Sequence, residues 1–178
     1  MKKISVVINT YNAEKHLTTV LESVKDFDEV IVCDMRSEDS TISIAEKYGC
    51  KIVYCERHSY VEPVRNFAIS QAANEWILVI DADETVPKEL KNYLYKIAET
   101  PNLGGVYIPF KNYFIDSYMR SAFPDFKLRF FRKEGANWPI DIHSTVKVIG
   151  DIIKIPRKRI DLASEHLAND SVTTILAK

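Results

Sequence analysis

The stretch WILVIDADETVP, residues 76–87, joins five apolar residues to a cluster of three carboxylates. Such a short apolar run is typical of a strand that is buried on both faces of a parallel sheet. The run ends at Asp81, and Asp83 lies two residues further on, so both carboxylates project to the same side of an extended backbone. Two hard oxygen donors in this position would suit Mg²⁺ or Mn²⁺ shared with phosphates.

Segments of strand and helix character alternate on both sides of this stretch. Further β-branched runs predict strands at residues 4–8, 29–34 and 51–55. Apolar residues at helical spacing predict helices within residues 13–24, 40–48, 62–73 and 87–98. We expect Phe67 to lie on the inner face of the third helix. This alternation predicts an α/β fold with a mostly parallel sheet covered by helices.

The pattern changes after about residue 100. The segments GGVYIPF and FKLRFF indicate strands, and no segment with helical periodicity lies between them. We therefore expect a β-rich second half. With 178 residues and 46% hydrophobic content, the chain suits one domain with one sizeable core.

The amino-acid composition indicates which binding partners and which cellular compartment to expect. The net charge is only -1, yet residues 111–159 hold 11 Lys and Arg against 5 Asp and Glu, which would suit phosphates or an anionic membrane surface. Without interleaved aromatic motifs or a pI above about 9, we expect no nucleic-acid partner. No apolar run approaches the roughly 18 residues of a membrane span, and the N-terminus lacks a signal-peptide pattern, so we expect a cytoplasmic protein. The three cysteines are expected to be free thiols.

The carboxylates at the strand ends allow three interpretations. In an open parallel sheet, ligands bind beside the carboxyl ends of the strands, where Asp34 and Asp81 are expected. The acidic cluster could instead only begin a helix, whose first turn favours negative charge. Asp81, Asp83 and Thr85 also match the D-x-D-x-T nucleophile motif of the haloacid dehalogenase-like phosphatases. That motif normally follows the first strand of its domain, whereas here three βα units precede it.

Four longer segments carry a family resemblance that covers most of residues 1–145: VVINTYNAEKHL, VIVCDMRSEDSTISIAEKYG, EPVRNFAISQAANEWILVIDADE and LRFFRKEGANWPIDIHSTV. In order and spacing they resemble glycosyltransferase family 2, the nucleotide-sugar transferases of the GT-A fold. They are most similar to its lipopolysaccharide-core and related β-glycosyltransferases. The resemblance implies a single GT-A domain over residues 1–178. Its nucleotide-binding half would be residues 1–100, and its acceptor-side half residues 101–178, shorter than in typical relatives.

The resemblance assigns most of the nucleotide site to the first half of the chain. Thr10, Tyr11 and Asn12 match the loop that lies against the nucleobase, and Asp34 matches the aspartate that hydrogen-bonds it. Arg65, which Asn66 follows, would approach the nucleotide. These assignments imply a nucleoside-diphosphate sugar donor, most commonly a UDP-sugar.

The metal site follows from the same resemblance. Asp81 and Asp83 match the family DxD motif: Asp81 would reach the ribose or a metal-bound water, and Asp83 would ligate Mn²⁺ or Mg²⁺. His166 matches a late histidine that touches the metal or the diphosphate in some members. Arg129 and Arg132 match the basic strand motif, and a solvated strand edge is the other interpretation for both.

The chain departs from the family at the residue expected to be the general base. Many relatives have His-Glu where this chain has His143-Ser144, and serine cannot serve as that base at neutral pH. Asp141 is our candidate for the catalytic base, with Glu84 as another carboxylate that could take the role. The resemblance thus predicts a metal-dependent, inverting transferase acting on a glycan or lipid-linked hydroxyl, with contact at the inner membrane face. A nucleotide-sugar-binding module without transfer activity is the alternative.

Overall fold

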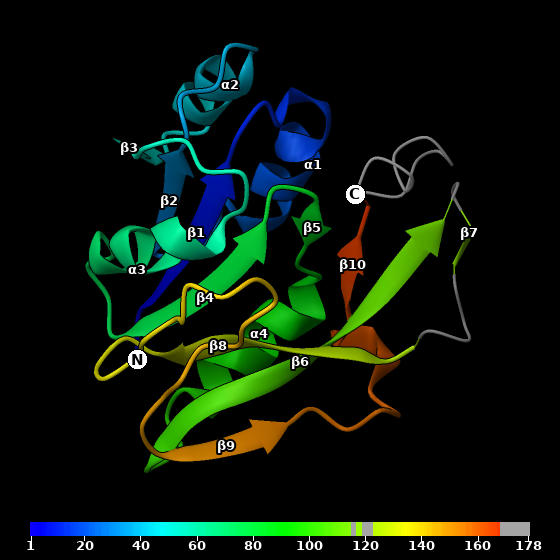
Figure 1. The fold of residues 1–178 in the computed structure, drawn as a ribbon. Helices are drawn as coiled ribbons and strands as arrows, with labels where there is room; N and C mark the ends of the chain where they lie inside the picture. Colours follow the sequence, from blue (N-terminus) through cyan, green and yellow to red (C-terminus); the bar gives the residue numbers. More distant parts are fainter. Residues whose placement is uncertain (115–116, 119–122, 168–178) are drawn as a thin grey trace.

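One mixed sheet organises the chain in a computed structural model that describes residues 1–114, 117–118 and 123–167 (Figure 1). The main strand order is β3-β2-β1-β4-β8-β6-β10-β5, and β7 and β9 pair with β6 outside this path. The first half of the chain supplies the strands β1 Ile4–Thr10, β2 Glu29–Asp34, β3 Lys51–Tyr54, β4 Trp76–Asp81 and β5 Glu84–Thr85. The second half supplies β6 Leu103–Phe114, β7 Ser117–Tyr118, β8 Asp125–Arg132, β9 Asp151–Lys154 and β10 Ser164–His166.

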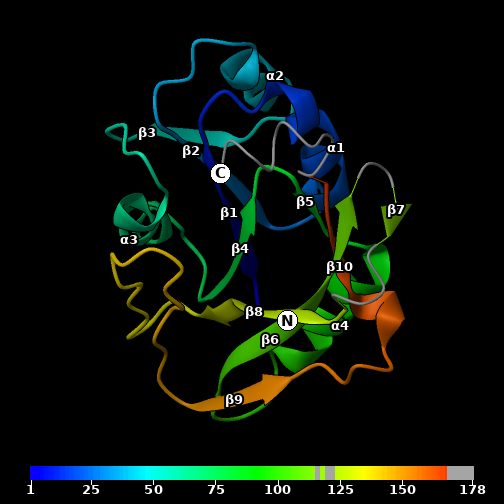
Figure 2. The same ribbon diagram turned by 45° about the vertical axis from the view of Figure 1, so that its right-hand side comes forward.

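Helices cover the parallel part of this sheet. They are α1 Glu14–Val24, α2 Thr41–Lys47, α3 Glu62–Ser70 and α4 Lys88–Ile97, and a 3₁₀ turn covers Ile160–Leu162. The alternation that the sequence predicts is confirmed over the first half, and so is the β-rich second half. In the two ribbon views α1 and α3 lie over different faces of the sheet (Figures 1 and 2). None of the described helices is long and apolar enough to cross a membrane.

The central strands are buried on both faces, which explains their unbroken apolar sequence. All seven residues of β1 are buried. Alternate positions serve different cores: Val6 and Ile8 pack with α1 and α4, whereas Val7 packs with α3. Each fully buried aliphatic side chain of this kind stabilises the fold by about 1.5–3 kcal/mol.

The inner face of α3 differs from our expectation. Phe67 is 43% exposed, so its predicted inward position is wrong. Val64, Arg65, Ala68 and Ile69 are the buried residues of this helix. Arg65 can be buried on the inner face because its guanidinium pairs with a carboxylate at the end of β4, as described below.

The sheet changes direction beside β4. On one side β4 pairs with β1 in parallel, and on the other it pairs with β8 in antiparallel register. Between β6 and β8 the register shifts, because Val106 pairs with Phe130 while Tyr107 pairs with Leu128. Arg129 is therefore an extra residue in β8, a β-bulge of the kind that often re-aims a side chain beside a functional site.

Candidate functional site

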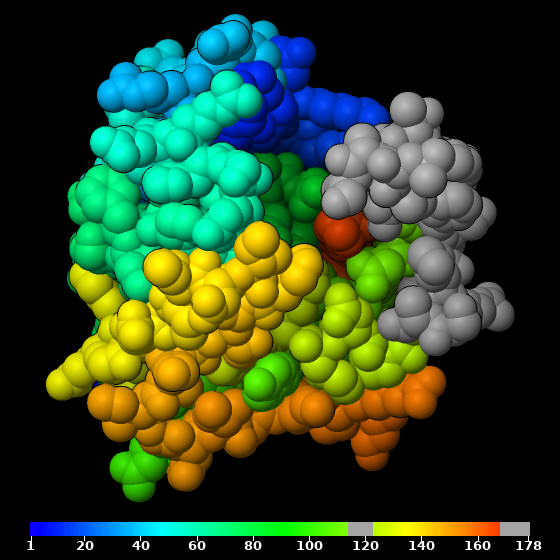
Figure 3. Space-filling model, viewed as in Figure 1, coloured from blue at the N-terminus to red at the C-terminus, as the bar shows by residue number. Residues whose placement is uncertain are grey.

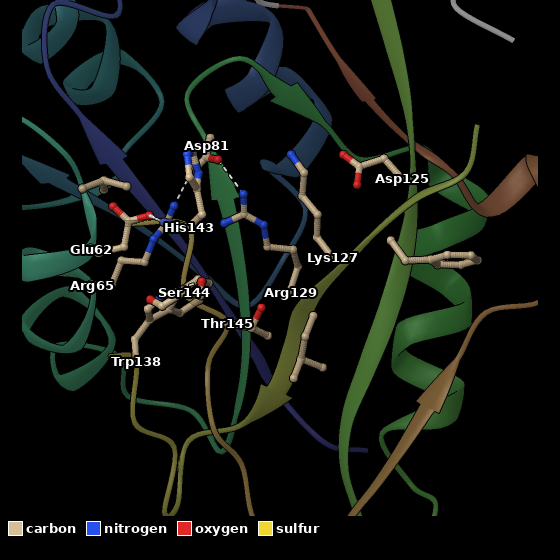
Figure 4. Close-up of a pocket in the computed structure, with 13 residues that line it drawn as sticks. Glu62, Arg65, Asp81, Asp125, Lys127, Arg129, Trp138, His143, Ser144 and Thr145 are labelled. Atoms are coloured by element: carbon tan, nitrogen blue, oxygen red, sulfur yellow. Dashed lines mark hydrogen bonds and ion pairs between the residues drawn. The ribbon is translucent and has the colours of Figure 1, made fainter. Parts of the chain in front are cut away.

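Asp81, the last residue of β4, is held between two arginines from distant parts of the chain. Arg65 Nη2 donates to Asp81 Oδ1 at 2.9 Å, and Arg129 Nη2 donates to Oδ2 at 2.5 Å (Figure 4). Both arginines are buried, at 4% and 5% exposure. Burial by itself would raise the pKa of Asp81, but the charges of Arg129 and Arg65 outweigh it and hold that pKa well below its ordinary value. Asp81 is thus a fixed carboxylate.

Glu84 extends this arrangement into a row of alternating charges. Its side chain has 0% exposure, and Glu84 Oε1 accepts from Lys127 Nζ at 2.8 Å and from Arg129 Nη2 at 3.3 Å. Glu84 Oε2 also accepts the backbone N–H of Asp81 at 3.0 Å. We call Arg65, Asp81, Arg129, Glu84 and Lys127 the charge row. Because neighbours in the row have opposite signs, its buried charges are paired, as buried ions must be.

Trp138 packs against the arginines from the loop that follows β8. The Arg65 guanidinium lies 4.4 Å from the Trp138 ring centre and that of Arg129 lies at 5.8 Å, within the range of cation–π attraction. The Asn66 side chain binds the backbone of Trp138 twice: Oδ1 accepts from N at 2.8 Å, and Nδ2 donates to O at 2.8 Å. The loop is therefore tied to α3 beside the charge row.

A cavity of about 450 Å³ opens at this end of β4. It lies between the start of α3, the first half of β8 and the loop around Trp138. In the space-filling view, green atoms of the β4–β5 region lie at the bottom of a recess between the cyan segment, the yellow loop and the red β10 (Figure 3). The polar and charged lining residues are Glu62, Arg65, Asp81, Asp125, Lys127, Arg129, His143, Ser144 and Thr145.

The ends of β1 and β2 hold the predicted nucleobase residues in a network of neutral donors. Asp34 has 0% exposure. Its Oδ1 accepts from Thr10 Oγ1 at 2.7 Å and from Ser37 Oγ at 2.6 Å, and its Oδ2 accepts from Ser37 N at 2.7 Å. These three hydrogen bonds occupy three of the roughly four acceptor positions of the carboxylate, so Oδ2 keeps one position with which it could accept from a nucleobase.

The two other residues of the predicted nucleobase loop are also held in place. Asn12 adopts φ 46°, and its Oδ1 accepts from Glu38 N at 2.9 Å. Arg57 lies 4.2 Å from the ring centre of Tyr11. Their roles toward a nucleobase stay predictions.

The predicted metal residues face each other across β5 and β10. His166 Nε2 lies 3.6 Å from Asp83 Oδ1, which is buried and has no hydrogen-bond partner among the described residues. His166 Nδ1 lies 3.0 Å from Asn112 Oδ1. When that oxygen accepts a hydrogen bond from Nδ1, Nε2 of the neutral imidazole is the nitrogen that could ligate a cation beside Asp83. Within the described ranges no group of three or more His, Cys, Asp or Glu could hold a metal ion by itself. A divalent cation bound by one or two side chains together with substrate phosphates fits this donor set.

The residues proposed as a general base are placed differently. Glu84 is excluded, because it has no exposed surface and both its oxygens are engaged within the charge row. Asp141 is exposed and is not among the lining residues of the cavity, so its assignment stays a prediction. Ser144 serves the loop itself: its Oγ donates to Pro139 O at 2.6 Å, and its carbonyl oxygen accepts from Trp138 Nε1 at 3.2 Å.

Of the two arginines predicted from LRFFRK, one belongs to this site. Arg132 lies at the far end of β8, where its Nε donates to Leu103 O at 2.7 Å and its guanidinium pairs with Glu75. Sequence reasoning missed Glu62, Asp125, Lys127 and Trp138. For Asp125 and Lys127, their alternation with apolar residues in DFKLRF was an available signal.

Comparison with known proteins identifies a family for this chain. The family described as Glycosyl transferase family 2 matches residues 5–146. An uncharacterized glycosyltransferase of Rickettsia felis is 42% identical over 103 residues, which are 57% of this chain and 36% of that protein. The chain therefore spans about a third of the length of this curated relative.

Two solved structures illustrate the likeness in fold. Staphylococcus aureus TarS 1-349 in complex with UDP is similar at a TM-score of 0.55 and 35% identity, covering 62% of this chain and 36% of that one. Glucosyl-3-phosphoglycerate synthase from Mycobacterium tuberculosis, in complex with Mn²⁺, UDP and glucosyl-3-phosphoglycerate, is similar in fold at a TM-score of 0.51 and 21% identity. That match covers 64% of this chain and 44% of that one.

Proposed function

The chain belongs to glycosyltransferase family 2 and has the GT-A fold, and we propose that it transfers a sugar from a nucleoside-diphosphate sugar to a hydroxyl group. The observation that carries this proposal is the end of β4. There Asp81 is fixed by two buried arginines beside a cavity, and Asp83 faces His166 with an oxygen that has no partner among the described residues. The UDP bound to TarS, a 35% identical structure, supports UDP as the nucleotide.

In this proposal Asp83 and His166 hold Mn²⁺ or Mg²⁺ together with the donor diphosphate. When bound, the cation would screen the negative charge that develops on the departing nucleoside diphosphate. Asn112 orients the imidazole of His166, and the pairing of β5 with β10 keeps Asp83 and His166 adjacent. Asp81, already paired with two guanidiniums, orients the site and is a poor nucleophile, which disfavours the phosphatase interpretation.

The reaction in this proposal inverts the anomeric centre. An acceptor hydroxyl attacks the anomeric carbon from the side opposite the diphosphate, and a carboxylate removes its proton. The acceptor is a glycan or a lipid-linked hydroxyl, met in the cytoplasm or at the inner membrane face. The 11 Lys and Arg against 5 Asp and Glu in residues 111–159 support an acceptor that brings phosphate or an anionic surface with it.

Calorimetry of UDP and GDP, with and without Mn²⁺, tests the donor site directly. We expect UDP to bind more tightly with Mn²⁺, because the cation links the diphosphate to Asp83. The variant Asp83→Ala should lose the metal-dependent part of the affinity. Asp26→Ala is a matched control on an exposed aspartate whose Oδ2 lies 3.7 Å from Lys91 Nζ. Equal metal dependence in Asp83→Ala and the wild type would contradict the metal assignment. The absence of UDP and GDP binding to the wild type would contradict the donor assignment.

A further inference from the structure

Asp125, the first residue of β8, offers the cavity a carboxylate without a fixed partner. It is half-buried and lines the cavity. Among the described residues no hydrogen bond or ion pair holds its carboxylate, in contrast to Asp81 and Glu84 nearby. In the close-up, Asp125 lies on the opposite side of the cavity from Glu62 and His143, with Lys127 and Arg129 between them (Figure 4).

The sheet register places Asp125 at the reactive edge. Because β8 runs antiparallel to β4, its beginning lies at the carboxyl end of β4, where the paired register brings Leu78 opposite Phe130. Beyond Phe130 the bulged Arg129 contacts Asp81 and Lys127 contacts Glu84, so β8 continues along the carboxyl end of β4. Asp125 lies two residues further toward the crevice and on the same side of the strand as Lys127. Its own pairing with Phe110 of β6 anchors the backbone at this point.

The other carboxylates in or beside the cavity each have at least one oxygen engaged by another group of the protein. Asp81 and Glu84 belong to the charge row. Glu62 Oε1 accepts the backbone N–H of His143 at 3.1 Å and so holds the loop against α3. His143 adopts φ 63°, a conformation that non-glycine residues seldom take, so this hydrogen bond helps to maintain a strained loop.

We propose that Asp125 is the general base of the transfer reaction, an assignment that rests on the proposed function above. The Asp125 carboxylate takes the proton of the acceptor hydroxyl as the oxygen forms its bond to the anomeric carbon. The bond between that carbon and the diphosphate oxygen breaks, and its electron pair leaves with the nucleoside diphosphate. Protonated Asp125 then returns its proton to solvent. Such a group must lie in the cavity, which Asp125 does and the exposed Asp141 does not. Of the carboxylates that line the cavity, Asp125 is the one with both oxygens free of hydrogen bonds and ion pairs among the described residues, whereas Asp81 and Glu62 are engaged.

Release of UDP from UDP-glucose and UDP-N-acetylglucosamine in the presence of Mn²⁺ measures this step without the natural acceptor. Water then serves as the acceptor, and its proton also needs a base. We expect Asp125→Asn to lower kcat by about 10²–10⁴-fold, the usual contribution of a general base, while KM for the donor stays unchanged. Asp26→Asn, on an exposed aspartate outside the cavity, is the matched control and should keep the wild-type kcat. Asp141→Asn compares the rival assignment directly. Formate should restore part of the lost rate to Asp125→Ala, where it can occupy the vacated space, and none to Asp125→Asn.

Calorimetry of UDP with Mn²⁺ on the same variants separates a lost base from a lost fold. Unchanged UDP affinity in Asp125→Asn together with lost turnover supports the assignment. The assignment is overturned if Asp125→Asn keeps more than about a tenth of the wild-type kcat. A loss of kcat in Asp141→Asn as large as that in Asp125→Asn overturns it as well. A wild-type chain that neither binds UDP nor releases it would overturn the proposed function, and this assignment with it.

Discussion

The two ends of the same sheet edge hold their carboxylates in opposite ways. Asp34, at the end of β2, accepts only neutral donors from Thr10 and Ser37. Asp81, at the end of β4, accepts from the guanidiniums of Arg65 and Arg129. The difference lies in the charge of the partners. Thr10 and Ser37 are neutral donors at the ends of β1 and β2, whereas the two arginines come from α3 and from the bulge in β8.

We call the surroundings of Asp34 the neutral end and those of Asp81 the charged end. The contrast predicts that each contact at the charged end contributes more to stability than each contact at the neutral end. Removal of one partner from a buried ion pair leaves an uncompensated charge, which typically costs more than the loss of a neutral hydrogen bond. Three measurements can test the contrast, starting with its most strongly coupled residue.

Arg129→Ala should have the largest effect on stability. It removes the group that joins Asp81 and Glu84, and Glu84 has no exposed surface through which water could replace it. We expect the free energy of unfolding to fall by about 3–5 kcal/mol. Urea unfolding followed by circular dichroism measures this change.

Arg159→Ala is the matched control, because Arg159 pairs with Asp161 by the same chemistry on the surface. It should leave the free energy of unfolding unchanged, since exposed pairs contribute little. Equal losses in the two variants would show that the burial of the charge row adds nothing to stability.

Asp34→Asn tests the neutral end of the edge. Asparagine keeps the shape but replaces an accepting oxygen by a donor that would face Ser37 N or the two hydroxyls. We expect a loss of about 1–2 kcal/mol in the same urea experiment, within the range for hydrogen bonds of a charged acceptor. Asp26→Asn, on an exposed aspartate, should be neutral by comparison. A loss equal to that of Arg129→Ala would remove the distinction between the two ends.

The sequence predicts the neutral end better than the charged one. Strand ends at Asp34 and Asp81 follow from apolar runs that stop at a carboxylate, and these positions are confirmed. The family resemblance predicted that Arg65 faces the site, but its burial was not predicted, because the apolar pattern placed Phe67 on the inner face of the helix. A buried arginine can be recognised only once its partners are known.

The remaining residues of the site depend on register, which local patterns do not contain. The bulge at Arg129 changes which side chains of β8 share a face, and no residue type in LRFF announces it. Trp138 reaches Arg65 only because Asn66, 72 residues away in sequence, binds its backbone. Asp125 lines the same cavity as Asp81 only because β8 pairs antiparallel with β4. The family resemblance predicted that the loop around Trp138 belongs to the site. The role of the Asp125 carboxylate became visible only in the folded structure.

The smallest predicted effect concerns the pH dependence contributed by Asp39, which lies beside the neutral end. Burial by itself would raise the pKa of Asp39, but hydrogen bonds from the hydroxyl and N–H of Thr41 and from the N–H of Glu14 outweigh it, so this pKa is lowered. A lowered pKa in the folded state stabilises the protein above the pKa of the unfolded chain, near about 3.9, and this stabilisation is lost as the pH falls through the folded value. Between pH 5 and pH 3 the stability of the wild type should therefore fall more steeply than that of Asp39→Asn. The difference should stay below about 1.4 kcal/mol per pH unit, the slope for one proton, because Asp39 is only half-buried.

Repeating the pH series of wild type and Asp39→Asn at high salt tests whether neutral or charged groups lower the pKa of Asp39. Since neutral donors lower the pKa of Asp39, the difference in slope should persist in about 1 M NaCl, where the Debye length is about 3 Å. Urea unfolding across the pH series at low and high salt measures it. A difference that vanishes in salt would mean that charged groups act on Asp39 as well. The region around Asp34 would then depend on charged groups as the charge row does, and neutral against charged partners would no longer distinguish Asp34 from Asp81.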